Sequence, residues 1–288
     1  MPPLDQIQGA YETAKALCAE DLKSGAARDA IRKLSLLSLK FLLSQSAPIN
    51  LKSQVPGKQY ISFKINTTVA RPANSKYFVG DYDRLNDLWN QWNSGSIEPT
   101  NLSKLTYTAS LAPCLAMELF DRQNKKGPAT YFECFIGHIF ARALNQNPNK
   151  RASLTVGGCS VKLTMDFLFS GQGNDPHLHL PVKMSTRERV VQAWAHQKIL
   201  DSAFGENSYR GIMVLFSETK LNSKNLEVVE ICVPDQWLAY QKYLSKMYRI
   251  YYFDLPQRYQ SLTEEFPEDI QIKPFTEFFN EIAAIVSA

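Results

Sequence analysis

The segment from Pro181 to Leu200, with the sequence PVKMSTRERVVQAWAHQKIL, constrains the fold of this chain more than any other stretch. A short extended piece ends at Lys183, two hydroxyl residues follow, and a predicted helix opens at Arg187 with the charges Arg-Glu-Arg. A lysine suits a phosphate as a point charge, whereas arginine and glutamate can pair with base edges. The segment therefore predicts one strand-to-helix element that handles a phosphate and reads nucleic-acid bases.

Two predicted strands place a carboxylate beside that lysine. Apolar and polar residues alternate along the strand from Cys159 to Phe169, which puts Asp166 on its polar face. The next strand, His179 to Met184, has Lys183 opposite its own apolar residues. If the two strands pair as a hairpin, Asp166 and Lys183 project from the same face. A carboxylate that can hold Mg²⁺ and a cation that can support phosphate charge would then be neighbours.

The order of the other predicted elements favours an α/β or α+β core. After Lys183 come a helix to Ala203 and two buried strands, Gly211 to Phe216 and Glu227 to Cys232. A hairpin followed by strand, helix and strand predicts a central mixed β-sheet flanked by helices. Further helices are expected from Pro234 to about Met247 and from Phe275 to Val286, and the aromatic tract Tyr248 to Phe253 is either a strand or a buried helix.

The first 120 residues predict a mainly helical subregion packed on that core. Apolar residues recur at helical spacing from Leu4 to Leu43, with a break between two helices at Ser24 and Gly25. The predicted domains are therefore residues 1–120 and a core of residues 121–288. Within the first are expected a strand from Tyr60 to Val69, a short helix from Asp81 to Trp92 and a linker from Asn93 to Asn101.

Charge and cysteine content exclude several classes of protein. The net charge of +4 permits an acidic partner but does not require one. The chain has no run of about eighteen apolar residues and no secretory signal, so we expect no membrane association and a cytoplasmic location. The five cysteines form no CxxC pair, which argues against both a disulfide framework and a zinc site. We expect reduced, partly buried thiols.

A second acidic residue lies on a predicted helix with little polar surface. This helix is expected to start at Thr130, to end at about Leu144 and to carry Glu133 among apolar and aromatic residues. Thr130 and Glu133 also fit a capping box, T-x-x-E, as do Ser185 and Glu188. Each glutamate therefore has a structural role available beside a chemical one, and the residues alone leave both open.

With the acidic helix, the Asp166 strand, the Lys183 strand and the charged helix in this order, the chain resembles the core of the PD-(D/E)XK nucleases. More specifically, it is similar to type II restriction endonucleases that recognise CCGG and its interrupted relatives CCNGG. In that group the catalytic lysine begins the pattern K-x-x-x-R-(D/E)-R, which Lys183 to Arg189 matches position by position. The resemblance covers roughly Gly127 to Leu200 and implies a restriction-endonuclease-like core.

The resemblance implies a Mg²⁺-dependent endonuclease that hydrolyses both strands of double-stranded DNA at a short, symmetric site containing CC/GG. Asp166, Glu133 and the main-chain carbonyl of Val182 would bind the metal ion. Lys183 would orient the attacking water and stabilise the charge on the phosphate. These roles follow from the family and not from the spacing of the residues.

The chain departs from the family on the helix after the lysine. Where a further acid is usual, this chain has His196 and Gln197. Gln197 lies on the apolar side of the predicted helix, so we expect its amide to face inward and to support the water shell of the metal. The missing carboxylate leaves the number of metal ions open.

The candidate base-reading residues are Arg187, Glu188 and Arg189. Arginine presents a fork of donors to guanine and a carboxylate accepts from cytosine, so the triplet suits adjacent C·G pairs in the major groove. A symmetric site implies a homodimer in a prokaryotic cell, with each protomer cleaving one strand and no nucleotide cofactor. Candidate phosphate contacts are Lys125, Lys126, Ser185 and Thr186.

Other interpretations of these residues stay open. The pair His177 and His179 forms an HxH pattern, but no second ligand pair has suitable spacing, so we expect turn and strand residues there. Trp194 is expected in the core rather than against a base. The chain could also be a PD-(D/E)XK nuclease with a repair or nicking role, or a non-catalytic DNA-binding protein.

Overall fold

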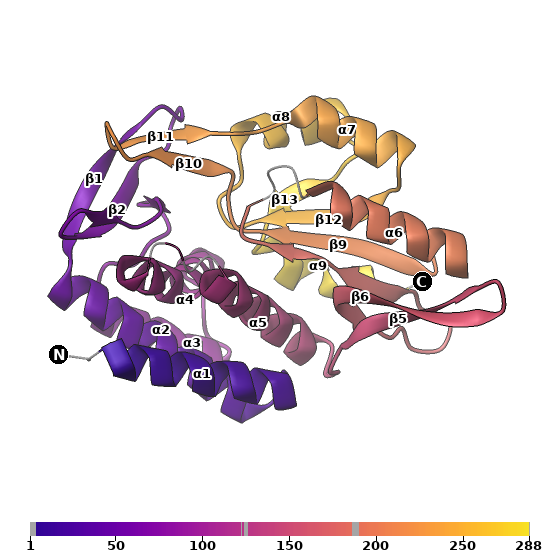
Figure 1. The fold of residues 1–288 in the computed structure, drawn as a ribbon, viewed down its shortest axis with the longest axis horizontal. Helices are drawn as coiled ribbons and strands as arrows, with labels where there is room; N and C mark the ends of the chain where they lie inside the picture. The colour runs from indigo at the N-terminus through magenta and orange to yellow at the C-terminus, as the bar shows by residue number, and fades with distance from the viewer. Residues whose placement is uncertain (1–3, 122, 124–125, 186–189, 288) are drawn as a thin grey trace. The chain divides into compact units, whose positions relative to one another are not determined.

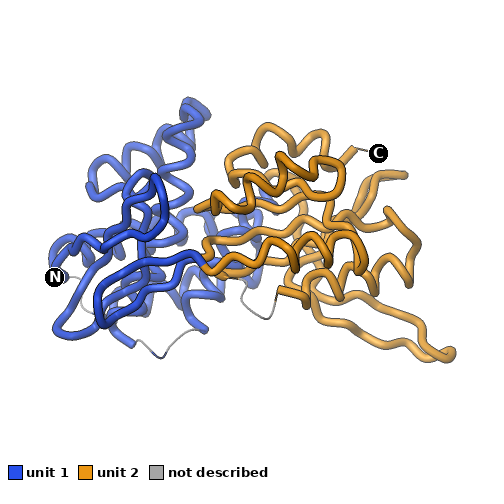
Figure 2. Tube along the Cα trace, turned by 90° about the horizontal axis from the view of Figure 1, so that it is seen from above, with its two compact units in different colours: residues 1–142, 219–230 blue, residues 143–218, 231–288 orange. Residues whose placement is uncertain are grey.

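The computed structural model of this protein describes residues 4–121, 123, 126–185 and 190–287 (Figure 1). Residues 1–142 and 219–230 form one compact unit, called unit 1, and residues 143–218 and 231–288 form unit 2 (Figure 2). The chain thus leaves unit 1 after Arg142 and returns to it for one β-hairpin. These compact units divide elsewhere than at residue 120, and the predicted domain boundary stays a prediction.

Helices make up most of the described part of unit 1. The predicted break at Ser24 and Gly25 is confirmed, since Ser24 Oγ accepts a hydrogen bond from the N–H of Ala27 at 3.0 Å and caps the second helix. The predicted helix near Asp81 is also confirmed, with Asp81 as its N-cap. The helices are α1 Leu4–Glu20, α2 Gly25–Gln45, α3 Tyr82–Ser94, α4 Pro99–Phe120 and α5 Lys126–Ala143.

The predicted linker from Asn93 to Asn101 is wrong, because only a tight turn joins the helices there. α3 ends at Ser94, Gly95 closes it in the left-handed conformation with φ 73°, and α4 begins at Pro99. Proline is favoured at the first position of a helix, where its missing N–H has no partner to lose. α4 is buried along most of its length, so it lacks the amphipathic pattern by which a helix is predicted.

Unit 1 also contains a sheet of six described strands. Its order is β10-β11-β1-β2-β3, with β4 paired to β2. The predicted strand from Glu227 belongs to this sheet and not to the central one, because β11 pairs in parallel with β1, Lys52 opposite Glu227. The strands are β1 Ala47–Ser53, β2 Tyr60–Ile65, β3 Thr68–Val69, β4 Ala73–Asn74, β10 Thr219–Asn222 and β11 Glu227–Glu230.

The sheet of unit 2 has seven described strands in the order β13-β12-β9-β7-β6-β5, with β8 paired to β9. β6 pairs with both β5 and β7 in antiparallel fashion, whereas β9 pairs in parallel with β7, β8 and β12. The predicted central mixed sheet is therefore confirmed. Its strands are β5 Asn149–Val156, β6 Cys159–Phe169, β7 His177–Leu180, β8 Val182–Lys183, β9 Tyr209–Leu215, β12 Met247–Tyr252 and β13 Ile272–Pro274.

Helices lie on both faces of this sheet (Figure 1). The rings of Tyr252 and Trp237 of α7 have centroids 6.0 Å apart, whereas the next residue, Tyr251, meets Phe278 of α9 at 6.1 Å. Neighbouring residues of a strand point to opposite faces, so α7 and α9 cover different faces. The aromatic tract Tyr248 to Phe253, which the sequence allowed as a strand or a buried helix, lies mostly in strand β12. The helices of unit 2 are α6 Val191–Phe204, α7 Pro234–Tyr243, α8 Gln257–Glu265 and α9 Glu277–Val286.

Trp194 of α6 is a core residue, as predicted. Its ring is fully buried and edge-on to Trp237, with centroids 5.1 Å apart, and its Nε1–H donates to Oε1 of Gln241 at 3.0 Å. Burial of a ring of this size stabilises a fold by about 3 kcal/mol. The packing holds α6 on the sheet and so positions the helix that follows Lys183. No helix in the described ranges is long and apolar enough to cross a membrane.

Candidate active site

The predicted hairpin of the Asp166 strand and the following strand is present. β6 and β7 pair with Phe167 opposite Leu180, and the ladder stops there at Pro181. β8 then continues the line of β7 along β9, since Val182 lies opposite Val214. Proline has no N–H to give to a ladder, which suits this interruption. One long strand is therefore broken into β7 and β8 at the point where its neighbour carries Asp166.

Asp166 fills the interruption with its side chain. Lys183 Nζ donates to Oδ2 of Asp166 at 2.8 Å, and the N–H of Val182 donates to the same oxygen at 2.9 Å. The side chains of Lys183 and Asp166 are 25% and 22% exposed, so the pair is held in place but open to solvent. The two residues that the sequence placed on one face are thus in direct contact, and a main-chain donor orients the carboxylate.

The carbonyl of Val182 faces the same edge of the strand as Asp166. The carbonyls of Pro181 and Lys183 accept hydrogen bonds from Val214 and Phe216, at the edge toward β9. Successive main-chain groups of a strand point to opposite edges, so the N–H and carbonyl of Val182 point away from β9. The N–H of Val182 donates to Asp166, and the carbonyl oxygen of Val182, at the same edge, is a second possible metal ligand.

These donors fit a magnesium ion. Carboxylate and main-chain carbonyl oxygens are hard ligands, and Mg²⁺ is commonly held by one or two carboxylates while water and substrate phosphates complete its shell. The described residues contain no cluster of three or more His, Cys, Asp or Glu that could hold a metal. A site made of Asp166, the carbonyl of Val182 and water does not require such a cluster.

Glu133 lies in the other compact unit. It is half-buried on α5 in unit 1, whereas Asp166, Val182 and Lys183 lie in unit 2. The capping box suggested for it is wrong, because α5 begins at Lys126 and Thr130 stands inside the helix rather than at its N-cap. Glu133 is therefore not part of a capping box, and its role at the metal stays a prediction.

The predicted DNA-contacting residues are only partly described. Ser185 is exposed just after β8, and Lys126 is the exposed first residue of α5. The remaining members lie outside the described residues, so the helix expected from Arg187 is described from Val191 onward. Contacts of this group with bases and phosphates stay predictions; the undescribed members are Lys125, Thr186, Arg187, Glu188 and Arg189.

Gln197 faces inward, as expected, but its amide is engaged by protein. Oε1 accepts a hydrogen bond from Nδ1 of His179 at 3.0 Å. Nε2 donates to Oδ1 of Asp201 at 2.9 Å and to the carbonyl of Tyr209 at 2.8 Å. Gln197 is 1% exposed and lies directly on the backbone of Gly211, where a Cβ would come within 2.6 Å of Oε1. The support of a metal water shell by this amide stays a prediction.

Two histidines that sequence reasoning did not assign to the site lie near Asp166. His179 is buried, and burial lowers its pKa to about 4. His196 is half-buried, and its ring centroid lies 6.2 Å from that of His179. Burial lowers the pKa of His196, while Asp166 raises it and Lys183 lowers it. The alternation of side chains along a strand could have indicated His179, because His179 lies four residues before Lys183 and so shares its strand face.

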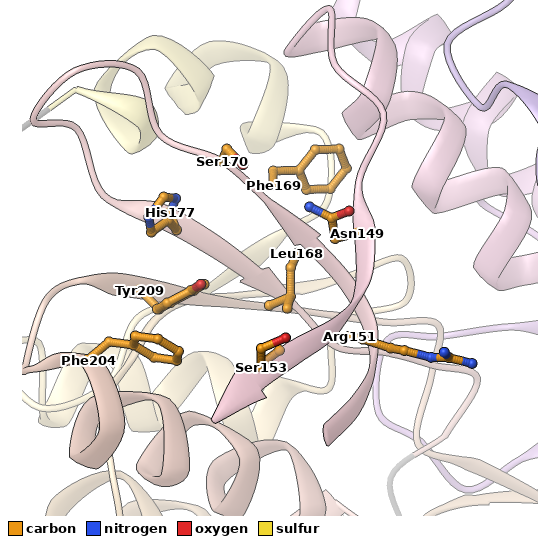
Figure 3. A pocket seen from close by; sticks show the side chains of 10 residues that line it. Asn149, Arg151, Ser153, Leu168, Phe169, Ser170, His177, Phe204 and Tyr209 are labelled. Carbon is orange, nitrogen blue, oxygen red and sulfur yellow. The ribbon is translucent and has the colours of Figure 1, made fainter. Parts of the chain in front are cut away.

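A separate pocket of about 200 Å³ opens where β7 begins, and Lys183 of β8 does not line it (Figure 3). His177 lines it beside Tyr209, with ring centroids 4.9 Å apart, and its Nδ1 accepts a hydrogen bond from the N–H of Gly171 at 2.9 Å. His179 contacts Gln197 instead. The two histidines of the HxH pattern therefore have different partners, and both lie in strand β7, so the turn expected at His177 is wrong.

The mixed sheet, the helices on both of its faces and the interrupted strand beside Asp166 define a restriction-endonuclease-like fold. The structure is similar to the crystal structure of the type IIP restriction endonuclease Kpn2I, with a TM-score of 0.82 and 23% identity over 99% of this chain and 100% of that chain. The predicted fold class and resemblance to type II restriction endonucleases are confirmed at the level of the fold.

A weaker similarity links the chain to the restriction endonuclease PspGI in its complex with substrate DNA. It has a TM-score of 0.45 and 16% identity over 70% of this chain and 91% of that chain, and we draw no conclusion from it. No family model matches the sequence, and no curated protein matches it.

Proposed function

We propose that this protein is a Mg²⁺-dependent type II restriction endonuclease that hydrolyses both strands of double-stranded DNA at a short, symmetric site of the CCGG or CCNGG type. The observation that carries the proposal is the contact of 2.8 Å between Lys183 Nζ and Asp166 Oδ2 at the interruption between β7 and β8. The restriction-endonuclease-like fold supports it independently.

In this proposal Asp166 and the carbonyl of Val182, together with Glu133, hold the metal ion. When bound, Mg²⁺ would neutralise charge on the scissile phosphate and make its bound water more acidic. Lys183 would bind a non-bridging phosphate oxygen and orient the water, which requires it to exchange part of its contact with Asp166 for the phosphate. Partial exposure of both side chains is consistent with this exchange.

Base recognition is assigned to Arg187, Glu188 and Arg189, which directly follow the catalytic strand in the sequence. Each well-paired residue contributes about 1–3 kcal/mol of discrimination between bases. Because the reading residues and Lys183 share one continuous segment, a mismatched base would also displace the catalytic lysine. A symmetric site is cut on both strands by two copies of this chain, related by a twofold axis.

Digestion of a sequenced phage DNA tests the proposal. Wild type, Lys183→Ala and Lys198→Ala are incubated with Mg²⁺, and the fragment ends are sequenced. Lys198 is an exposed lysine of α6 and serves as the matched control. We expect wild type and Lys198→Ala to give discrete fragments that end at one motif containing CC and GG, and Lys183→Ala to leave the DNA intact.

Other results would redirect the assignment. A smear of fragments would retain a nuclease and reject the base-reading role of Arg187 to Arg189. Intact DNA with wild type, combined with tight specific binding that is indifferent to Mg²⁺ and to Lys183→Ala, would instead show a non-catalytic DNA-binding protein. Binding measured in Ca²⁺ at several salt concentrations separates these cases, since phosphate contacts make DNA affinity salt-dependent.

A further inference from the structure

The amide of Gln197 is committed to a buried network. Both of its N–H groups are donated, to Asp201 and to the carbonyl of Tyr209, and its oxygen accepts from His179. The other oxygen of Asp201 accepts from the hydroxyl of Ser245. A neighbour that gave up one of these bonds would be left with a buried unpaired group, which is unfavourable. Gln197 therefore acts on its surroundings only through its partners.

Among the partners of Gln197, His179 shares a face of the sheet with Asp166. In the β6–β7 ladder Leu168 lies opposite His179, so Asp166, two residues before Leu168, projects from the same face as His179. An amide oxygen can only accept, so Gln197 holds the proton of His179 on Nδ1 and leaves the lone pair on Nε2. This bond fixes the ring orientation of a buried neighbour of Asp166.

α6 covers this face of the sheet, and His196 is its group beside His179. Leu200 of α6 packs in the cluster that contains Leu168, which places the helix over the strand face that carries Asp166. The two imidazoles have ring centroids 6.2 Å apart. On the helix, Asp201 is already bonded to Gln197 and Ser245, whereas His196 is half-buried and within electrostatic range of Asp166 and Lys183.

We propose that His196 supplies an imidazole nitrogen to the metal ion held at Asp166, and that Gln197 is a positioning residue that acts through His179. This inference rests on the proposed function, and it names which group of α6 meets the metal. Imidazole suits Mn²⁺, Co²⁺ and other transition metals better than Mg²⁺, which prefers oxygen. The site is therefore expected to favour Mn²⁺ over Mg²⁺ more than a site built from oxygen alone.

Metal binding by the full chain without DNA tests the His196 assignment. Mn²⁺ affinity is measured by electron paramagnetic resonance and Mg²⁺ affinity by competition, for wild type, His196→Ala, His196→Glu and the exposed control Lys198→Ala. We expect His196→Ala to weaken Mn²⁺ binding by about tenfold or more and Mg²⁺ binding much less. His196→Glu should shift the preference toward Mg²⁺. Equal Mn²⁺ affinities of wild type, His196→Ala and Lys198→Ala would overturn the assignment.

The role of Gln197 has its own spectroscopic test. In ¹⁵N-labelled protein, the imidazole resonances of His179 should show the proton on Nδ1, and Gln197→Met should move it partly to Nε2. A wild-type protein with the proton on Nε2 would overturn this role, whether or not the variant folds.

Cleavage assays separate this inference from the proposed function. If wild type cleaves DNA and His196→Ala keeps the same ratio of Mn²⁺- to Mg²⁺-supported rates, His196 is not a ligand and the nuclease assignment stands. If no metal supports cleavage by wild type but His196→Ala still weakens Mn²⁺ binding, the metal site stands and the nuclease assignment fails.

Discussion

Lys183 of β8 donates to Asp166 of β6 at 2.8 Å. The described pairings of β8 are with β9 and those of β6 are with β5 and β7, so this side-chain bond joins two strands that share no described main-chain pairing. The N–H of Val182 donates to the same carboxylate oxygen, so a side chain replaces the main-chain partner where the ladder stops. This arrangement places a carboxylate at the interruption of an otherwise continuous strand. We therefore expect that either residue can be replaced with a large effect on cleavage and a small effect on the free energy of unfolding.

Replacing the lysine should abolish cleavage with little effect on stability. Because Lys183 and Asp166 are each about a quarter exposed, their ion pair contributes only about 0–1 kcal/mol to folding. Lys183→Met is expected to lower the cleavage rate at least about 100-fold, since it removes the cation that supports the phosphate charge. Parallel cleavage assays and thermal melts check this, with exposed Lys162 of β6 changed to Met as the control. Equal loss in both variants would contradict it.

Gly211→Ala should destabilise the protein through crowding. An added Cβ would lie 2.5 Å from Sδ of Met247 and 2.6 Å from Oε1 of Gln197. Met247 can adjust but Gln197 is tied to its partners, so we expect a loss of about 1–3 kcal/mol in the free energy of unfolding. Gly9→Ala, at an exposed position of α1, meets nothing within 4 Å and should stabilise slightly. Denaturant unfolding of both variants measures the contrast, and similar midpoints would contradict it.

The inward amide should matter more for stability than an outward one on the same helix. Gln197→Leu leaves the N–H of His179 and the carbonyl of Tyr209 without their partner, at about 1–3 kcal/mol for each group. Gln192, exposed on α6, has no such role, so Gln192→Leu should change the free energy of unfolding by less than about 0.5 kcal/mol. Urea titrations of the two variants make the comparison; equal destabilisation would reject the network.

Stability should fall in mild acid because of a buried histidine in unit 1. His138 on α5 bonds the carbonyl of Leu22 through Nδ1, and burial lowers its pKa to about 4. In the unfolded chain its pKa is about 6.5, so the unfolded state takes up the proton first as the pH falls. The free energy of unfolding should therefore drop between about pH 6.5 and 4, by at most about 3 kcal/mol from this group.

His138→Asn isolates that contribution. The variant should be less stable than wild type at pH 7, and the difference should shrink by about 3 kcal/mol as the pH approaches 4. Chemical unfolding at a series of pH values measures it. A constant difference across the range would show that the pKa of His138 is the same in the folded and unfolded states.

Much of the fold could be predicted because its signals are local. Alternation of apolar and polar residues predicts β6, a capping serine predicts the start of α2, and pairing of two adjacent strands predicts that Asp166 and Lys183 share one face. Helix α4 and the sheet to which β11 belongs have no such local signal, and the sequence did not predict them. α4 is buried on nearly all sides and shows no amphipathic stripe, and β11 looks like any other short apolar strand although it pairs with β1.

The sequence by itself determined the order of elements and the pairing of a carboxylate with a lysine, because both depend on short-range periodicity and turn chemistry. Only the tertiary structure decided which polar groups the interior uses. Gln197 and His196 are neighbours on one helix, yet the first is bonded to His179, Asp201 and Tyr209 while the second is half-exposed beside the site. That difference depends on partners from β7 and β9, which are far enough away in the chain that no spacing rule connects them.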